Sequence, residues 1–111
     1  MASRSRNTRR HRRQTVRILV DYQSGDAVCC DYATTLGAGG LFIECEDALP
    51  PATMLKLRFR LPHSEELHEL EGRVTWRREA HAERSLAPGM GVQFSDSSAR
   101  AKLAHDLDDL G

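Results

Sequence analysis

Residues Met54–Leu61 read MLKLRFRL, and this stretch decides the fold class of the chain. Leucine and phenylalanine occupy every second position, while lysine and arginine fill the positions between them. Successive side chains of a β-strand point to opposite faces, so such alternation is typical of a strand with one face in a core and the other in water. The stretch therefore predicts a half-buried strand of an antiparallel sheet.

Similar stretches occur on both sides of this strand and are bounded by turn residues such as Ser24-Gly25-Asp26 and Pro62-His63-Ser64. Short strands at near-regular spacing indicate an antiparallel sandwich or a closed barrel, because closure removes exposed strand edges. Within the stretch that ends at Trp76, strict alternation places Val74 and Trp76 on one face, which predicts that Trp76 packs against the barrel. The further predicted strands are Gln14–Tyr22, Ala27–Ala33, Gly40–Glu44, Leu67–Trp76 and Gly89–Phe94.

The last part of the chain predicts one helix. Asp96 or Ser97 can cap its start, since short polar side chains accept hydrogen bonds from the first free N–H groups of a helix. Leu103, Leu107 and Leu110 follow at helical spacing and form one apolar stripe. Two roles fit the stripe: it covers an open end of the barrel, or it forms a contact between two copies of the chain.

Length and composition limit the class of protein. The chain has 111 residues, enough for one domain with a modest core. Its formal net charge is zero, which argues against binding of a nucleic acid polymer, since such domains are usually strongly basic. No apolar run approaches the about 20 residues of a membrane span, and no signal peptide is recognisable. Three cysteines without C-x-x-C spacing fit a reducing compartment, so we expect a cytoplasmic protein.

The positive charge is concentrated at the N-terminus, where seven arginines occur between Arg4 and Arg17 with no acidic residue among them. Guanidinium groups grip phosphate oxygens two at a time. The turn Gly37-Ala38-Gly39-Gly40 allows a ligand to approach the backbone closely. The longer turn from Thr35 to Gly40 could present backbone N–H groups as an anion-binding nest. Together they predict a site for a phosphorylated ligand, with residues 1–8 as a flexible basic tail and residues 9–111 as the folded domain.

Other chemistry finds little support in the sequence. The glycine turn is followed by a strand and by no Lys-Ser or Lys-Thr pair, so it is not a P-loop or a dinucleotide fingerprint. The five histidines are scattered, with no spacing typical of a metal site. No serine or cysteine lies in a recognisable nucleophile motif. We therefore expect a protein without enzymatic activity, bound metal or cofactor.

Five blocks in this order resemble the PilZ domain. The first is Arg9-Arg10-His11-Arg12-Arg13; then come Val16 with Tyr22, Gly39–Glu44, Gly72–Trp76 and Pro88–Phe94. The likeness is closest to the short single-domain form of myxobacteria and relatives. It implies an all-β fold, a six-stranded antiparallel barrel with a C-terminal α-helix, in a bacterial receptor for the second messenger cyclic di-GMP.

The resemblance also implies a set of ligand-binding residues. The family signature is R-x-x-x-R followed by (D/N)-x-S-x-x-G; Arg9 and Arg13 match the first part, and Gly40 matches the final glycine. Thr35 stands where Asp or Asn is expected, and Gly37 where Ser is expected. A second register, Arg13 with Arg17, would place the pair inside a strand. The implied site residues are Arg9, Arg10, Arg13, Thr35, Gly37, Gly39 and Gly40.

Two functions follow from this resemblance. In the first, the protein binds cyclic di-GMP and relays the signal to a protein partner, as a monomer or weak homodimer; Trp76 could then line the ligand face on the barrel exterior. In the second, it is a degenerate adaptor that binds a protein without nucleotide. Thr35 and Gly37 favour the second, because each lost hydrogen bond to a charged group costs about 1.5–3 kcal/mol. Two such losses would weaken binding roughly a hundredfold or more.

Overall fold

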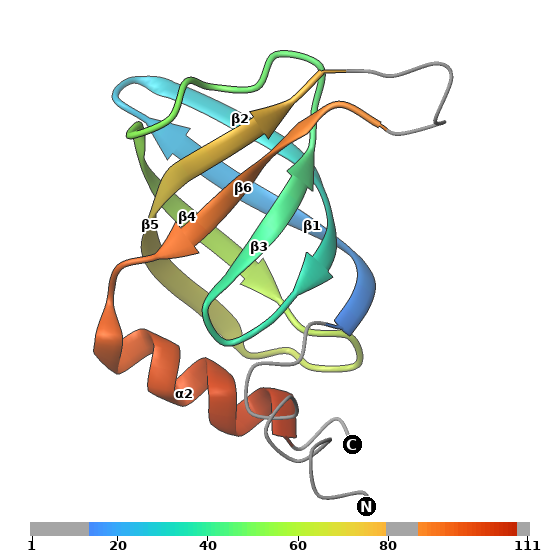
Figure 1. Cartoon of the computed structure of the whole chain (residues 1–111). Coiled ribbons are helices and arrows are strands. Elements are labelled where there is room, and N and C mark those ends of the chain that lie inside the picture. Colours follow the sequence, from blue (N-terminus) through green and yellow to red (C-terminus); the bar gives the residue numbers. More distant parts are fainter. Residues whose placement is uncertain (1–13, 80–86, 109–111) are drawn as a thin grey trace, which may run out of the picture.

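The computed structural model describes residues 14–79 and 87–108, and they form a barrel with one helix at its end (Figure 1). Six antiparallel strands close in the order β1-β2-β3-β6-β5-β4. The fold class predicted from the sequence is confirmed, with a barrel rather than a sandwich. The elements are β1 (Gln14–Ser24), β2 (Ala27–Leu36), β3 (Gly40–Glu44), β4 (Met54–Arg60), β5 (Leu67–Arg78), β6 (Gly89–Phe94) and α2 (Ser97–Asp108).

The barrel interior is filled by the alternate side chains that the sequence pattern selects. On β4, Leu55, Leu57 and Phe59 are 2%, 1% and 2% exposed, while the intervening basic side chains face outward. Each buried Leu or Phe contributes about 1.5–3 kcal/mol relative to an exposed one. Strand β4 therefore buries one face in the core and exposes the other, as predicted.

Helix α2 covers one end of the barrel (Figure 1). Its start is capped by Asp96, whose Oδ1 accepts a hydrogen bond from the N–H of Ala99 at 3.1 Å. Leu103 and Leu107 belong to the barrel core, which confirms the first of the two roles proposed for the stripe. Leu110 and the proposed domain boundary at residue 8 lie outside the described residues.

The register shifts at three places: between Thr15 and Ile18 on β1, and at one bulge on each of β2 and β5. On β2, Ala33 pairs with Ile43 and Thr35 with Phe42, so Thr34 is an extra residue. On β5, Val74 pairs with Val92 and Trp76 with Gly91, so Thr75 is an extra residue. A bulge places the residues after it on the opposite face from that given by simple alternation.

The prediction that Trp76 shares a face with Val74 is therefore wrong. Val74 is 1% exposed and lies in the core, whereas Trp76 is 46% exposed and lies on the barrel exterior. The single inserted residue, Thr75, accounts for the difference.

Candidate ligand site on the barrel exterior

A continuous row of paired residues crosses five strands of the barrel. Thr15 pairs with Thr35, Thr35 with Phe42, Phe42 with Gly91, and Gly91 with Trp76. Directly opposed residues in an antiparallel sheet point to the same face. Since Trp76 is exposed and Phe42 lies outside the core cluster, the row from Thr35 to Trp76 faces outward.

The centre of this row is an aromatic stack. The rings of Phe42 and Trp76 lie 5.3 Å apart at an interplanar angle of 25°. The Arg78 guanidinium lies 4.5 Å from the centre of the Phe42 ring, and its Nε donates a hydrogen bond to the carbonyl of Ala87 at 2.8 Å. The stack therefore combines an exposed indole face with a cation that is held in place, which suits a flat, anionic ligand.

Two glycines on β6 form the floor of the stack. A Cβ at Gly91 would lie 2.8 Å from Trp76 Cδ1 and closer still to its Nε1. A Cβ at Gly89 would lie 2.5 Å from Phe42 Cζ. Both rings thus approach backbone that has no side chain, so no other residue type permits this arrangement without displacing a ring.

The glycine turn lies at the end of the same strands and is held by its own hydrogen bonds. The N–H of Gly37 donates to the carbonyl of Gly40 at 3.0 Å, and the carbonyl of Gly39 accepts from the N–H of Phe94 at 2.9 Å. The only glycine of positive φ in the described part of the chain is Gly25. The turn therefore contains no glycine of positive φ, and the Gly37 N–H is already used within it, while the anion-binding nest stays a prediction.

Gly40 has a structural reason to be glycine. A Cβ there would lie 3.2 Å from the carbonyl carbon of Val92 and closer still to its oxygen. By contrast, nothing lies within 4 Å of a Cβ built at Gly39. Of the two glycines matched to the site, Gly40 is thus needed for close packing of β3 on β6, while Gly39 is exposed and unconstrained.

Arg9, Arg10 and Arg13 lie outside the described residues. The structure does give the point at which they enter: Gln14, the residue after Arg13, pairs with Leu36, which directly precedes the glycine turn. The barrel therefore begins, at Gln14, beside the residue that precedes Gly37. Arg17, in the second register considered for the motif, lies within β1 with its guanidinium 4.1 Å from the centre of the Tyr32 ring.

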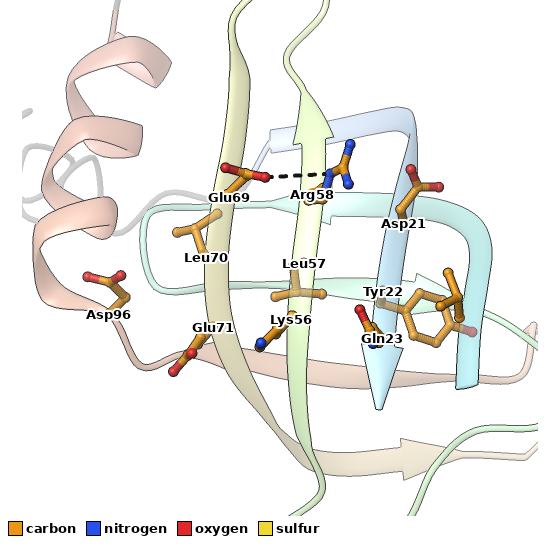
Figure 2. A pocket seen from close by; sticks show the side chains of 11 residues that line it. Asp21, Tyr22, Gln23, Lys56, Leu57, Arg58, Glu69, Leu70, Glu71 and Asp96 are labelled. Carbon is orange, nitrogen blue, oxygen red and sulfur yellow. Dashed lines mark ion pairs between the residues drawn. The ribbon is translucent and has the colours of Figure 1, made fainter. Parts of the chain in front are cut away.

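A separate groove of about 520 Å³ lies on the outer side of β1, β4 and β5 (Figure 2). Its ionisable lining comprises the acidic Asp21, Glu69, Glu71 and Asp96 and the basic Lys56 and Arg58. Arg58 is also paired with Glu69 at 3.7 Å. This excess of carboxylates disfavours a ligand with two phosphates, so we place the candidate site at the aromatic row rather than in the groove.

Inside the barrel, one polar pair contributes to stability rather than to a site. The hydroxyl of Tyr22 donates to Oδ2 of Asp31 at 2.6 Å. Burial, and then this hydrogen bond, raise the pKa of Tyr22 well above its ordinary value. Within residues 14–79 and 87–108, no group of three His, Cys, Asp or Glu side chains could hold a metal ion. The described part of the chain also contains no helix long and apolar enough to cross a membrane.

Sequence reasoning missed Phe42 and Arg78 as members of the site. Phe42 lies within the apolar run Leu41–Ile43 and is itself 6% exposed, so nothing in the pattern separates it from its two neighbours in the barrel core. The usable signal was the alternating pair Gly89 and Gly91, because glycines at alternate positions of a strand leave room for rings from adjacent strands.

Comparison with known proteins supports the fold and identifies the family. The family model of the PilZ domain matches residues 7–108. The Bacillus subtilis inhibitor of motility MotI/DgrA has a similar fold, with a TM-score of 0.69 at 19% identity over 88% of this chain and 49% of that one. The PilZ domain of CeSA from a cellulose-synthesizing bacterium gives a TM-score of 0.61 at 18% identity, over 86% of this chain and 97% of that one.

This chain thus spans about half the length of MotI/DgrA. The search of curated proteins found no match. At these identities the two solved structures establish the fold alone, whereas the family model covers nearly the whole sequence and includes the arginine segment, the glycine turn and the strands of the aromatic row. The chain belongs to the PilZ family, a family of binding domains for cyclic di-GMP.

Proposed function

We propose that this protein is a non-enzymatic receptor that binds cyclic di-GMP at the aromatic row and relays the signal to a protein partner. The observation that carries the proposal is the strand register. It brings Gln14, the glycine turn and the Phe42–Trp76 stack to one side of the barrel. The arginine segment therefore enters beside a surface that can accept a planar base.

The division of roles follows from chemistry. Cyclic di-GMP has two phosphates and two guanines, so it needs cations for the first and flat faces for the second. Arg9 and Arg13 supply bidentate guanidinium groups, with Arg10 beside them. The exposed face of Trp76 supplies a stacking surface, and base stacking of this kind contributes about 1–3 kcal/mol per base.

Thr35 lies in the same row, next to Phe42. Its side chain offers one polar atom to the guanine edge, where the Asn or Asp of the family signature would offer two. The departure at Thr35 therefore weakens recognition of the guanine edge but leaves the cationic and stacking parts of the site. We expect binding that is weaker than that of a member with the full signature.

The test is a calorimetric titration of the whole chain with cyclic di-GMP, repeated with fluorescence of Trp76, the only tryptophan. Binding should quench or shift the Trp76 emission and should weaken as salt rises, because phosphate contacts are screened. Arg9→Ala/Arg13→Ala should abolish binding, and Thr35→Asn should tighten it. The absence of both heat and a change in emission at high micromolar ligand would refute the proposal.

A second function, a protein adaptor that binds no nucleotide, is favoured by one observation. The Gly37 N–H, the only donor that this residue offers in place of the expected serine, is used within the turn. If this function is correct, the whole chain retains a protein partner in a pull-down equally well with and without cyclic di-GMP. Arg9→Ala/Arg13→Ala then changes the binding of that partner, and neither the variant nor the unmodified chain binds the nucleotide.

A further inference from the structure

The outer face of β1 and β2 has exposed apolar side chains that the candidate ligand site does not use. Leu19 and Tyr32 are opposed across the two strands and are 53% and 38% exposed. Val28, further along β2, is 68% exposed, and the exposed Cys30 lies between Val28 and Tyr32 on the same face. We call these four residues the outer β1–β2 patch. Contiguous apolar surface of this kind commonly marks a contact with another protein.

Charges of opposite sign lie on the two sides of Leu19 along β1. Arg17 precedes Leu19 by two residues, and its guanidinium is held on this face, 4.1 Å from the centre of the Tyr32 ring. Asp21 follows Leu19 by two residues and is opposed by Cys30 on β2 and Arg58 on β4. The order along the strand is therefore cation, apolar side chain, anion.

This order is self-complementary about a two-fold axis. If the axis lies in the plane of the contact, level with Leu19 and at right angles to β1, the two faces meet and β1 of one copy lies antiparallel to β1 of the other. Each charge is two residues from the axis, about 7 Å along the strand. Arg17 then meets the partner's Asp21, the partner's Arg17 meets Asp21, and the apolar side chains cover one another. A partner with a surface of a single sign would not satisfy both charges.

We propose that the outer β1–β2 patch is the contact of a weak two-fold homodimer of this chain, with Arg17 of each copy beside the partner's Asp21. The apolar area is small, so the dimer forms reversibly as the protein concentration rises. This inference does not depend on nucleotide binding, because it uses no residue of the aromatic row and none of Arg9, Arg10 and Arg13.

Sedimentation velocity over a concentration series tests the proposal with the whole chain. A reductant is present so that the exposed Cys29 and Cys30 cannot link two copies covalently. The unmodified protein should pass from monomer to dimer. Arg17→Glu alone and Asp21→Arg alone should each raise the dissociation constant roughly tenfold or more, because each places like charges together twice in the dimer.

The decisive sample is an equimolar mixture of the two variants. A heterodimer of Arg17→Glu with Asp21→Arg pairs opposite charges at both positions, so the mixture should dimerise about as well as the unmodified protein. Both positions are exposed, and circular dichroism with Trp76 emission checks that each variant is folded. Three results would each overturn the proposal. The unmodified chain could stay monomeric up to about millimolar concentration, or the single variants could dimerise like the unmodified protein. The third is a mixture that dimerises no more tightly than either variant alone.

Discussion

The aromatic row can be tested by filling its glycine floor. In Gly91→Ala, the new Cβ would lie 2.8 Å from Trp76 Cδ1, inside van der Waals contact, and still closer to Nε1. The backbone of β6 is fixed by its pairing with β3 and β5, whereas the indole is at the surface. We therefore expect the indole to leave the Phe42 ring and turn toward solvent.

The cost of this displacement follows from the burial of Trp76. Trp76 is 46% exposed, so about half of its surface is covered. For a large aromatic side chain that is roughly 100 Å², about 2.5 kcal/mol at about 25 cal/mol per Å². The stack with Phe42 adds about 0.5–1.5 kcal/mol. Because a displaced ring keeps some contact with the surface, we expect a loss of about 1–3 kcal/mol.

The assay is urea unfolding followed by circular dichroism, with the emission spectrum of Trp76 recorded in the folded state. Gly91→Ala should shift the emission maximum to the red and lower the free energy of unfolding. Gly39→Ala is the matched control, because nothing lies within 4 Å of its Cβ and its φ is not positive; it should be neutral or slightly stabilising. An unchanged emission maximum, with a stability equal to that of Gly39→Ala, would refute the description of the stack. If the stack binds guanine, Gly91→Ala also weakens cyclic di-GMP binding.

Three further predictions concern stability. Burial and the hydrogen bond to Asp31 raise the pKa of Tyr22 above its ordinary 10.0, so the neutral phenol stabilises the fold below about pH 10 and this contribution is lost as pH rises further. The urea midpoint should therefore fall less steeply from pH 8 to 12 in Tyr22→Phe than in the unmodified protein. An equal slope in the two proteins would contradict this prediction. Leu103→Ala, at a side chain that is 0% exposed, should cost about 2–5 kcal/mol in urea unfolding, and a cost below about 1 would mean that α2 does not seal the barrel. Ala52 has φ 78°, a conformation that glycine adopts more readily than alanine or valine. Ala52→Gly should therefore leave the urea midpoint equal or higher, whereas Ala52→Val should lower the free energy of unfolding by more than about 1 kcal/mol. An unchanged free energy of unfolding in Ala52→Val would contradict the strain at this turn.

The strands and the helix could be predicted because their signals are local and periodic. The side chains of β4 alternate without a break, and Leu103 and Leu107 recur at helical spacing, so each pattern specifies a face that must be buried. The family resemblance then gave the closure of the barrel, which alternation alone left open between a barrel and a sandwich. Arg9, Arg10 and Arg13 remain predictions, since they lie outside the described residues.

The site was harder to predict because it depends on departures from periodicity. Thr34 and Thr75 are ordinary strand residues in the sequence, and only their pairing partners make them bulges. Without the bulge at Thr75, Trp76 would follow Val74 into the core; without the bulge at Thr34, Thr35 would follow Ala33 inward. The two bulges turn both side chains outward onto the row that contains Phe42. The inserted residues that make simple alternation predict the wrong face for Trp76 therefore also create the exposed surface on which the proposed receptor function rests.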